Sequence, residues 1–381
     1  MIFGMHLPLP ATSPNSAILI AAISGRSLAA AARRAGFRPL VADLFNDADT
    51  LALADRAVKL AGNLRGGIDD ERIIEALADL ARDDRPLAVI YGSGFERKSE
   101  MIDIIAGRFM LAGNSGKTVR LVKDPQGLAA LCDELDIPHP EIRIDPPANP
   151  KGWLTKLAGG AGGSHVKRAK GDAGAEHYFQ RFVAGKNISV LFVADRRKAH
   201  IVGFSRQWSS PSRHTPYRYG GAVRLRRFER SKTSKVEGWL TALTGRTGLA
   251  GLNSADFIEG DGGLHLIEIN PRPGATLDIF DSDHTPLLRE HLRAIMGADI
   301  SVPEYSGSAA SGIAYTAKAI NVFPKIDWPA LTADHQMSGT TLAAGDPVCT
   351  VFATAPSAAA AMRAVKDRIK ELSINWRGDF P

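Results

Sequence analysis

Residues 251–274 read GLNSADFIEGDGGLHLIEINPRPG and carry more information about structure than any other part of the chain. Two β-like runs flank Asp261-Gly262-Gly263, and a three-residue loop containing glycine is a common hairpin connection. Pairing about that loop sets Asp256 opposite Glu268. Residues opposed across an antiparallel pair share a face, and alternation puts Asn270 on that face as well. Two carboxylates and an amide oxygen are therefore expected to converge at a strand end.

These three side chains suit a hard cation, because Mg²⁺ prefers oxygen ligands and often binds together with phosphate. A solvated edge hairpin that happens to carry acids is the alternative. The metal site is favoured because Glu268 lies inside the apolar run Leu-Ile-Glu-Ile, where a lone carboxylate is costly unless paired or metal-bound. Arg272 follows in a Pro-Arg-Pro-Gly turn. It is a candidate for a bidentate grip on phosphate, with an ordinary surface arginine as the alternative.

A glycine-rich turn lies upstream, at residues 159–164, directly after the strand-like run 153–157. Backbone N–H groups of such a turn can cradle phosphate, and Lys156 can reach the same oxygens. A plain flexible hinge is the alternative. Beyond the turn, the apolar stretch 178–183 could stack an adenine, although an ordinary buried strand is favoured when this stretch is taken alone.

A second glycine-containing string, Gly113-Asn-Ser-Gly-Lys-Thr118, ends like a P-loop. The P-loop needs a glycine five residues before its Gly-Lys pair, and that position is Leu111. We also expect no helix to begin at Lys117-Thr118. The P-loop interpretation is therefore disfavoured.

The composition is that of an ordinary globular protein of two or three domains. The chain has 381 residues, 44% hydrophobic and 23% charged, which excludes a disordered chain and a coiled-coil rod. A formal charge of +6 is mild and suits anionic small molecules as well as nucleic acid. Arg224, Arg226, Arg227 and Arg230 are interpreted as a solvated face, so no nucleic-acid partner is expected.

Cysteine usage and hydropathy indicate a reducing compartment and no membrane contact. Cys132 and Cys349 lie far apart without a CxxC spacing, so neither a disulfide framework nor a zinc cage is expected. The apolar run 17–23 is far shorter than a membrane span. The first sixteen residues lack the basic segment of a signal peptide. We expect a cytoplasmic protein.

Four regions follow from the order of helix-like and strand-like stretches: 1–112, 113–183, 184–300 and 301–381. The first alternates strand and helix, which predicts a parallel sheet built from βαβ units. The last is β-rich and closes with a helix. We expect strands at 17–23, 39–44, 87–91, 153–157 and 188–193, and one more that ends near residue 183. We expect helices at 71–82, 125–135 and 356–372, and one more that ends at Arg34.

The succession of these features resembles the ATP-grasp superfamily. A lysine before a helix, a second lysine with a glycine loop and a hinge strand precede Asp and then Glu-x-Asn, and the segment 267–273 is the most specific part. The similarity extends from about residue 17 to 372, with further family-like segments at 43–45, 91–96 and 339–349. It is closest to predicted ATP-dependent carboxylate–amine ligases, some of which are linked to one-carbon carriers of the methanofuran and methanopterin type.

The resemblance implies an ATP-grasp fold of mixed α/β and α+β type. A Rossmann-like domain precedes the core, region 113–183 is the lid subdomain, region 184–300 holds Mg-ATP, and a β-rich extension follows. ATP with Mg²⁺, or Mn²⁺, is the implied cofactor, and Lys156 and Arg272 are implied to act in catalysis. The implied ATP contacts are Lys123, Lys156, Gly159, Gly160, Gly162, Gly163, Ser164, Gln180, Phe182, Val183 and Asn187, and the implied metal ligands are Asp256, Glu268 and Asn270.

The chain departs from the family pattern in three places. Leu157 stands where a proline usually follows the second lysine. The earlier lysine lies in Lys123-Asp124, where many members have Asp-Lys. Asn187 aligns with the usual ribose-binding glutamate.

Such enzymes typically convert a carboxylate into an acyl phosphate, which an amine then attacks. The implied partners are a small-molecule carboxylate and an amine, and the implied assembly is a homodimer. Carboxylase-type or phosphoryl-transferring chemistry, and nucleotide binding without turnover, are the alternatives.

Four residues are candidates for substrate contact. Glu96 follows a strand at the usual ligand edge of an α/β sheet and could hold an ammonium group, with a surface turn as the alternative. Arg206 and Arg218 belong to a polar loop at 205–221, which could close over an anionic substrate or be solvated. Asp278 completes the set.

Overall fold

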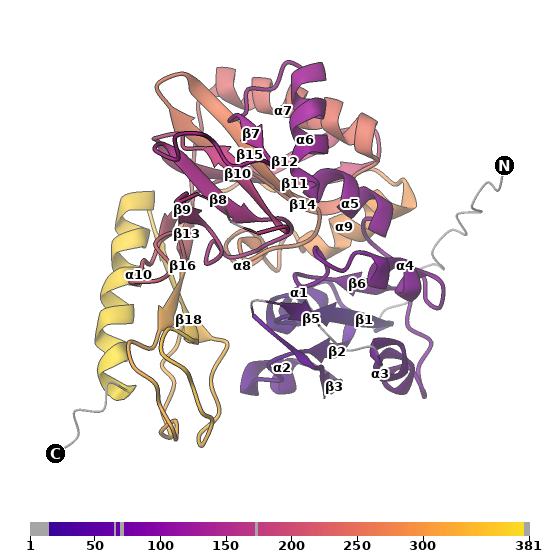
Figure 1. Ribbon diagram of the computed structural model, residues 1–381. Helices are drawn as coiled ribbons and strands as arrows, with labels where there is room; N and C mark the ends of the chain where they lie inside the picture. The colour runs from indigo at the N-terminus through magenta and orange to yellow at the C-terminus, as the bar shows by residue number, and fades with distance from the viewer. Residues whose placement is uncertain (1–14, 65, 69–71, 172–173, 377–381) are drawn as a thin grey trace.

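The computed structural model describes residues 15–64, 66–68, 72–171 and 174–376. Its core consists of three sheets (Figure 1), which confirms the expected mixed α/β and α+β architecture. A four-stranded sheet has the order β3-β2-β1-β6, a second has the order β7-β10-β8-β9, and the largest has the order β15-β14-β11-β12-β13-β16-β18-β17. A two-stranded ribbon, β4-β5, is separate.

The first sheet is parallel, as the βαβ pattern predicts. β1 (Ala17–Ala22) lies between β2 (Arg38–Asp43) and β6 (Val89–Tyr91), and β3 (Arg56–Lys59) pairs with β2. All of β1 is buried, because helices cover both faces of such a sheet. The remaining elements are α1 (Arg26–Arg34), α2 (Ala48–Leu53), β4 (Gly62–Asn63), β5 (Gly67–Ile68), α3 (Ile73–Leu80) and α4 (Glu100–Ala106).

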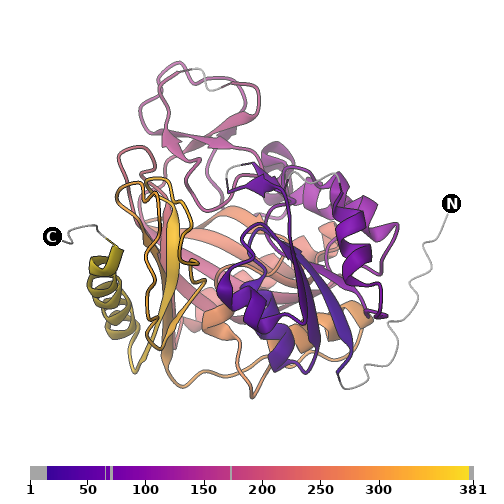
Figure 2. The same cartoon turned by 90° about the horizontal axis from the view of Figure 1, so that it is seen from below.

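The second sheet forms a small lobe that projects from the rest of the molecule (Figure 2). We call this lobe, residues 141–183, the lid. Its strands are β7 (Ile142–Arg143), β8 (Trp153–Leu157), β9 (Lys167–Arg168) and β10 (His177–Arg181). The helices that precede it, α5 (Gly116–Lys123) and α6 (Pro125–Glu134), instead pack on the large sheet, where Val122 and Cys132 join its core.

The large sheet is antiparallel and holds the carboxylate hairpin at one edge. The strands from the C-terminal region continue it at the other edge, so the region 301–381 extends the sheet rather than forming a separate one. Residues 377–381 lie outside the described residues. The strands are β11 (Lys186–Asp195), β12 (Ala199–Ser209), β13 (Tyr219–Arg224), β14 (Ala250–Gly260), β15 (Gly263–Asn270), β16 (Ser308–Tyr315), β17 (Thr332–Ala333) and β18 (Pro347–Ala355), and the helices are α7 (Arg230–Thr247), α8 (Leu277–Phe280), α9 (Leu287–Met296) and α10 (Ala358–Leu372).

Three expectations about local structure were wrong in whole or in part. The polar stretch 205–221 is a loop only at 210–218, because its two ends belong to β12 and β13. A helix does begin at the P-loop-like string, since α5 starts at Gly116 with Ser115 as its N-cap. Arg226, Arg227 and Arg230 are exposed, as expected, but Arg224 is not solvated. Its guanidinium lies 3.9 Å from the centre of the Tyr305 ring and donates to the Ile279 carbonyl at 2.7 Å.

No helix in the described part of the chain has the length and apolar composition that crossing a membrane requires. The expectation about a signal peptide concerns residues 1–16, of which 1–14 lie outside the described residues. The helix predicted over 71–82 begins at residue 71, which also lies outside them.

A buried ion-pair cluster joins the first domain to the C-terminal half. Arg26, at the start of α1, binds Asp278 through both terminal nitrogens at 2.8 and 2.7 Å. It also binds Asp334 at 2.9 and 3.0 Å. The side chains of Arg26 and Asp278 are 7% and 9% exposed. One guanidinium therefore holds three chain segments together.

Replacing Arg26 with methionine should destabilise the protein strongly. The change keeps the aliphatic bulk but leaves two carboxylates close together and largely out of water, and breaking a buried ion pair costs about 3–5 kcal/mol. Chemical denaturation should show that loss in the free energy of unfolding. Arg82→Met is the matched control, because Arg82 and its partner Asp79 are 70% and 69% exposed; it should cost about 0.5 kcal/mol or less. Equal free energies of unfolding for the two variants would contradict a stabilising role of the buried ion-pair cluster.

Candidate active site

The hairpin places Asp256 opposite Glu268, as the sequence predicted, but its turn and its register differ from the expected ones. The turn is two residues long, because Gly260 pairs with Gly263. A bulge between Asp256 and Phe257 then takes up Ile267 as an extra residue and restores the Asp256–Glu268 pair. Asn270 follows on the same face and donates from Nδ2 to Asp256 Oδ2 at 3.1 Å.

Lys123 reaches this face from the C-terminal end of α5. Its Nζ donates to Glu268 Oε1, and to Asn270 Oδ1 at 2.9 Å, and its side chain is only 6% exposed. The reversed Lys123-Asp124 order therefore does not remove this lysine from the site. Asp124 instead caps α6, where its carboxylate accepts from Gly127 N at 3.1 Å.

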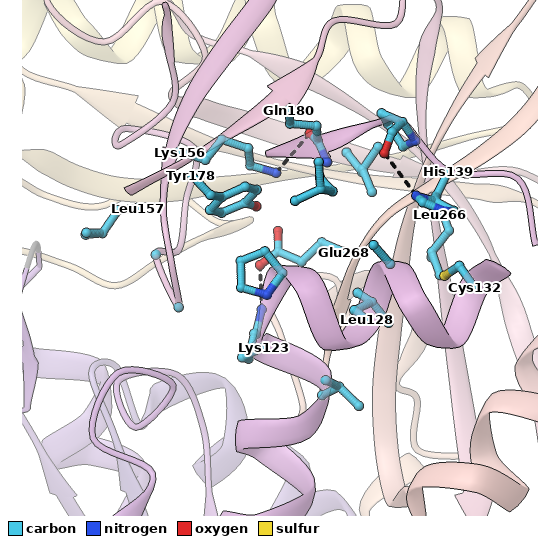
Figure 3. A pocket seen from close by; sticks show the side chains of 18 of the residues that line it. Lys123, Leu128, Cys132, His139, Lys156, Leu157, Tyr178, Gln180, Leu266 and Glu268 are labelled. Carbon is cyan, nitrogen blue, oxygen red and sulfur yellow. Dashed lines mark hydrogen bonds and ion pairs between the residues drawn. The ribbon is translucent and has the colours of Figure 1, made fainter. Parts of the chain in front are cut away.

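Lys156 approaches from the lid, on the opposite side of Glu268 (Figure 3). It lies on β8, is 5% exposed, and donates to Gln180 Oε1 at 3.3 Å. Its Nζ lies 5.7 Å from the centre of the Tyr178 ring. Burial acts to lower the pKa of Lys156, but Tyr178, Glu268 and Asp256 outweigh it and raise that pKa, so the lysine is a cation.

The two carboxylates respond differently to this surrounding. Burial raises the pKa of Asp256, and the charge of Glu268 raises it further. Burial acts in the same sense on Glu268, yet Lys123 and Lys156 overcome it and lower the Glu268 pKa to about 2. Like charges are thus held together by two cations from different subdomains.

A cavity of about 40 Å³ lies between the lid and the large sheet. Its polar end contains Lys123, Lys156, Glu268 and Gln180 (Figure 3). Its other end is lined mainly by apolar side chains, a wall suited to a flat ring with a polar group attached. That wall consists of Leu128, Ala129, Cys132, His139, Pro140, Ile142 and Leu266.

The oxygen donors of the hairpin fit a hard divalent cation. Asp256 and Glu268 repel one another, as the raised Asp256 pKa shows, and a cation between them would relieve that repulsion. Within the described residues no group of three or more His, Cys, Asp or Glu side chains could hold a metal. A metal site at the hairpin would therefore use the Asn270 amide oxygen as its third protein ligand, which stays a prediction.

Glu96 and Arg272 form a pair that the sequence did not predict. Arg272 Nε donates to Glu96 Oε1 at 2.7 Å, and their side chains are 10% and 5% exposed. Burial acts to raise the pKa of Glu96, but Arg272 and Lys123 lower it. Glu96 thus orients Arg272 at the end of the hairpin rather than facing an open turn.

The other three substrate candidates either bind other protein groups or lie on the opposite face of the large sheet. Gln207 donates to Asp256 Oδ1 at 3.3 Å, so Arg206, its neighbour along β12, projects from the opposite face of the sheet. Arg218 stacks 3.7 Å from the centre of the Tyr315 ring and donates to Ser210 and Gly345 carbonyls. Asp278 is bound by Arg26.

The expected ATP contacts divide into two groups. Lys123, Lys156, Gly159, Gly160 and Gln180 line the cavity, whereas Gly162, Gly163, Ser164, Phe182, Val183 and Asn187 are not among its lining residues. The Gly162 carbonyl accepts from Tyr219 N at 2.8 Å. Gly163 has φ +71°, and a Cβ there would lie 2.2 Å from the Tyr217 carbonyl, so this position requires glycine.

Several site residues were missed by the sequence analysis. Gln207 and the wall residues of α6 and β15 carry no motif, and only their alternation along strand or helix could have suggested them. His165 was also missed: its Nδ1 accepts from Leu157 N at 3.1 Å, and burial lowers its pKa to about 4.

Comparisons with known proteins agree with this geometry. Residues 128–276 match the model of the ATP-grasp domain. No curated protein matches the sequence. Similar solved structures include the biotin carboxylase domain of 2-oxoglutarate carboxylase from Hydrogenobacter thermophilus, a dimer in complex with MgADP and bicarbonate (TM-score 0.70, 13% identity, 93% of this chain and 90% of that chain). An L-amino acid ligase from Bacillus licheniformis has a TM-score of 0.68, 12% identity and coverage of 94% and 98%.

A further similar structure is N5-carboxyaminoimidazole ribonucleotide synthetase from Thermotoga maritima (TM-score 0.64, 15% identity, coverage of 93% and 98%). Identities this low show a shared fold. Together with the match of residues 128–276 to the ATP-grasp domain model, they confirm the expected fold.

Both thiols should be unreactive in the folded protein. Cys132, in the cavity wall, and Cys349 are each 1% exposed. Burial raises the pKa of each thiol to about 12, which leaves about one thiol in 10,000 ionised at pH 8. A thiol-reactive dye should therefore label neither cysteine in the native protein and both after denaturation. Rapid native labelling of Cys132 would show that the cavity wall is open.

Proposed function

We propose that this protein is an ATP-dependent carboxylate–amine ligase that releases ADP and phosphate. The observation that carries the proposal is the convergence of Lys123 and Lys156, from two subdomains, on the carboxylate face of the hairpin. Two cations beside two carboxylates and an amide oxygen form a site for a metal-bound polyphosphate. The similar structures with bound MgADP and ADP support that assignment.

Each end of the cavity then has a role. The apolar wall formed by α6, β7 and Leu266 receives the adenine ring, and the Gln180 amide lies where it can bond a polar edge. Lys156 and the backbone of Gly159 and Gly160 hold phosphate oxygens. Asp256, Glu268 and Asn270 hold Mg²⁺ or Mn²⁺, which supplies charge neutralisation at the transferring phosphoryl group.

The reaction proceeds without a protein nucleophile. A carboxylate oxygen of the acid attacks the γ-phosphorus of ATP, and ADP leaves. The amine nitrogen then attacks the acyl carbon, phosphate leaves, and a proton passes to water. Arg272, fixed by Glu96, lies at the end of the hairpin, where it can hold the acid or the phosphate that forms. Catalysis by positioning and charge is typical of phosphoryl transfer.

Other expectations stay predictions. The stretch 205–221 lies against the glycine turn at Tyr217 and Tyr219, which supports a role as a cover over the acyl phosphate. A homodimer and a link to methanofuran- or methanopterin-type carriers rest on the sequence resemblance, and a cytoplasmic location rests on cysteine usage and hydropathy.

Lys156→Ala should weaken the binding of ADP about ten- to a hundredfold. The variant removes a buried cation that contacts phosphate in this proposal, and a hydrogen bond to a charged group contributes about 1.5–3 kcal/mol. Calorimetry measures the affinity. Lys117→Ala is the matched control, because Lys117 is exposed at the start of α5 and should have no effect. Equal losses in the two variants would place phosphate at the P-loop-like string instead.

An acyl-phosphate intermediate should be trapped by hydroxylamine. Incubation of the protein with ATP, Mg²⁺, hydroxylamine and a panel of acids should yield one hydroxamate with an equal amount of ADP. The nearly isosteric Glu268→Gln should form neither, because it removes one of the two metal-facing charges, while circular dichroism should show that its fold survives. ADP release that requires bicarbonate and gives no hydroxamate would indicate carboxylase-type chemistry. A phosphorylated or acylated protein would exclude direct transfer.

A further inference from the structure

The P-loop-like string 113–118 has a function in this fold that differs from phosphate binding. The N-terminus of α5 has no room for a phosphate, because Gly116 N donates to Asp103 Oδ1 at 3.0 Å and a Cβ on Gly116 would lie 2.4 Å from the Ser99 carbonyl. Asn114, within this string, is 2% exposed and points to the hairpin instead. The contacts of Asn114 therefore indicate what this string does in the fold.

The Asn114 amide is bonded to both ends of the hairpin. Its Nδ2 donates to Asn253 Oδ1 at 2.8 Å and to the Pro271 carbonyl at 2.9 Å. Its Oδ1 accepts from Ala250 N at 2.8 Å. Ala250 and Asn253 lie at the start of β14, and Pro271 directly follows β15. One side chain thus ties the start of β14 to the residue that directly follows β15.

Tyr91 adds a second bond to the same point. Its hydroxyl lies 3.2 Å from the Pro271 carbonyl and 2.9 Å from the Asn114 carbonyl, and both bonds are buried. Tyr91 ends β6 of the first domain. The carbonyl between Asn270 and Arg272 is therefore held by two side chains from outside the large sheet.

We infer that Asn114 is a positioning residue for the metal site of the ligase proposed above. Pro271 separates the metal ligand Asn270 from Arg272, so the Asn114 amide sets the direction in which both side chains leave the hairpin. The inference rests on the proposed function. It assigns to Asn114 an effect on the metal that a merely structural residue would not have, because outer partners of metal ligands typically change metal affinity by about 10–100-fold.

The effect of Mg²⁺ on ADP affinity tests this inference by calorimetry. In the parent protein Mg²⁺ should strengthen ADP binding. In Asn114→Ala that strengthening should fall about tenfold, while ADP affinity without Mg²⁺ stays within about twofold. The matched control is Thr118→Val, which removes a buried bond of the same helix to the Thr247 carbonyl of α7 at 3.2 Å and none to the hairpin itself. It should keep the full effect of Mg²⁺.

If Asn114→Ala does not fold, Tyr91→Phe tests whether the bonds to the Pro271 carbonyl affect Mg²⁺ binding. It removes only the hydroxyl at the Pro271 carbonyl and should reduce the Mg²⁺ effect in the same direction. An unchanged Mg²⁺ effect in the folded variants, or an equal loss in Thr118→Val, would overturn the positioning role and leave the ligase proposal intact. A parent protein that binds ADP without any Mg²⁺ effect would overturn the metal site itself, and with it both proposals.

Discussion

Two carboxylates, Asp256 and Glu268, face each other across adjacent strands, and the rest of the site follows from the need to keep them there. Their repulsion grows as water is excluded, because the effective dielectric constant falls. Lys123 and Lys156 offset it in this structure, and the Glu268 pKa of about 2 reflects their combined charge. An ion or ligand that displaces either lysine from this face must offset the same repulsion between the carboxylates.

The elements that supply these groups come from separate parts of the chain, and α5 links them. Its N-terminal loop holds the base of the hairpin through Asn114, and its last residue, Lys123, reaches the carboxylates. A rigid helix thus fixes the distance between the two anchor points. The first domain contributes Glu96 and Tyr91 to the same hairpin end. The groups around the two carboxylates therefore come from all three sheets, although only the large sheet carries the carboxylates themselves.

The carboxylate face could be predicted from the sequence because alternation along a strand is a local rule. Even there, the expected three-residue loop was wrong, and the Asp256–Glu268 pair survived because a bulge offset the shorter turn. The Arg272–Glu96 pair could not be predicted, since it joins residues 176 positions apart through packing of two domains. The same applies to Asp278, whose partner Arg26 is set by the docking of α1 on α8.

The start of α5 was missed for a different reason. Its first residue is a glycine, which disfavours helix, and the Ser115 cap was the only local signal. The stretch 205–221 was expected to be a polar loop, but its first part is strand, where Gln207 bonds to Asp256. In both places a local preference conflicts with the tertiary role of the residues, and the tertiary role decides the structure.

The size of the cavity indicates how the site must work. At about 40 Å³ it is far below the roughly 300–1,000 Å³ of ligand pockets, so a nucleotide requires the lid to move outward. Among the described residues, two contacts resist this motion: Arg97 pairs with Glu176 at 2.9 Å, and Tyr219 N donates to the Gly162 carbonyl. The Arg97–Glu176 pair is largely exposed on the glutamate side and contributes little stability. The charges of Glu268 and Asp256 also attract Lys156 of the lid and act to raise its pKa, so a nucleotide phosphate bound at Lys156 would compete with that attraction as the lid moves.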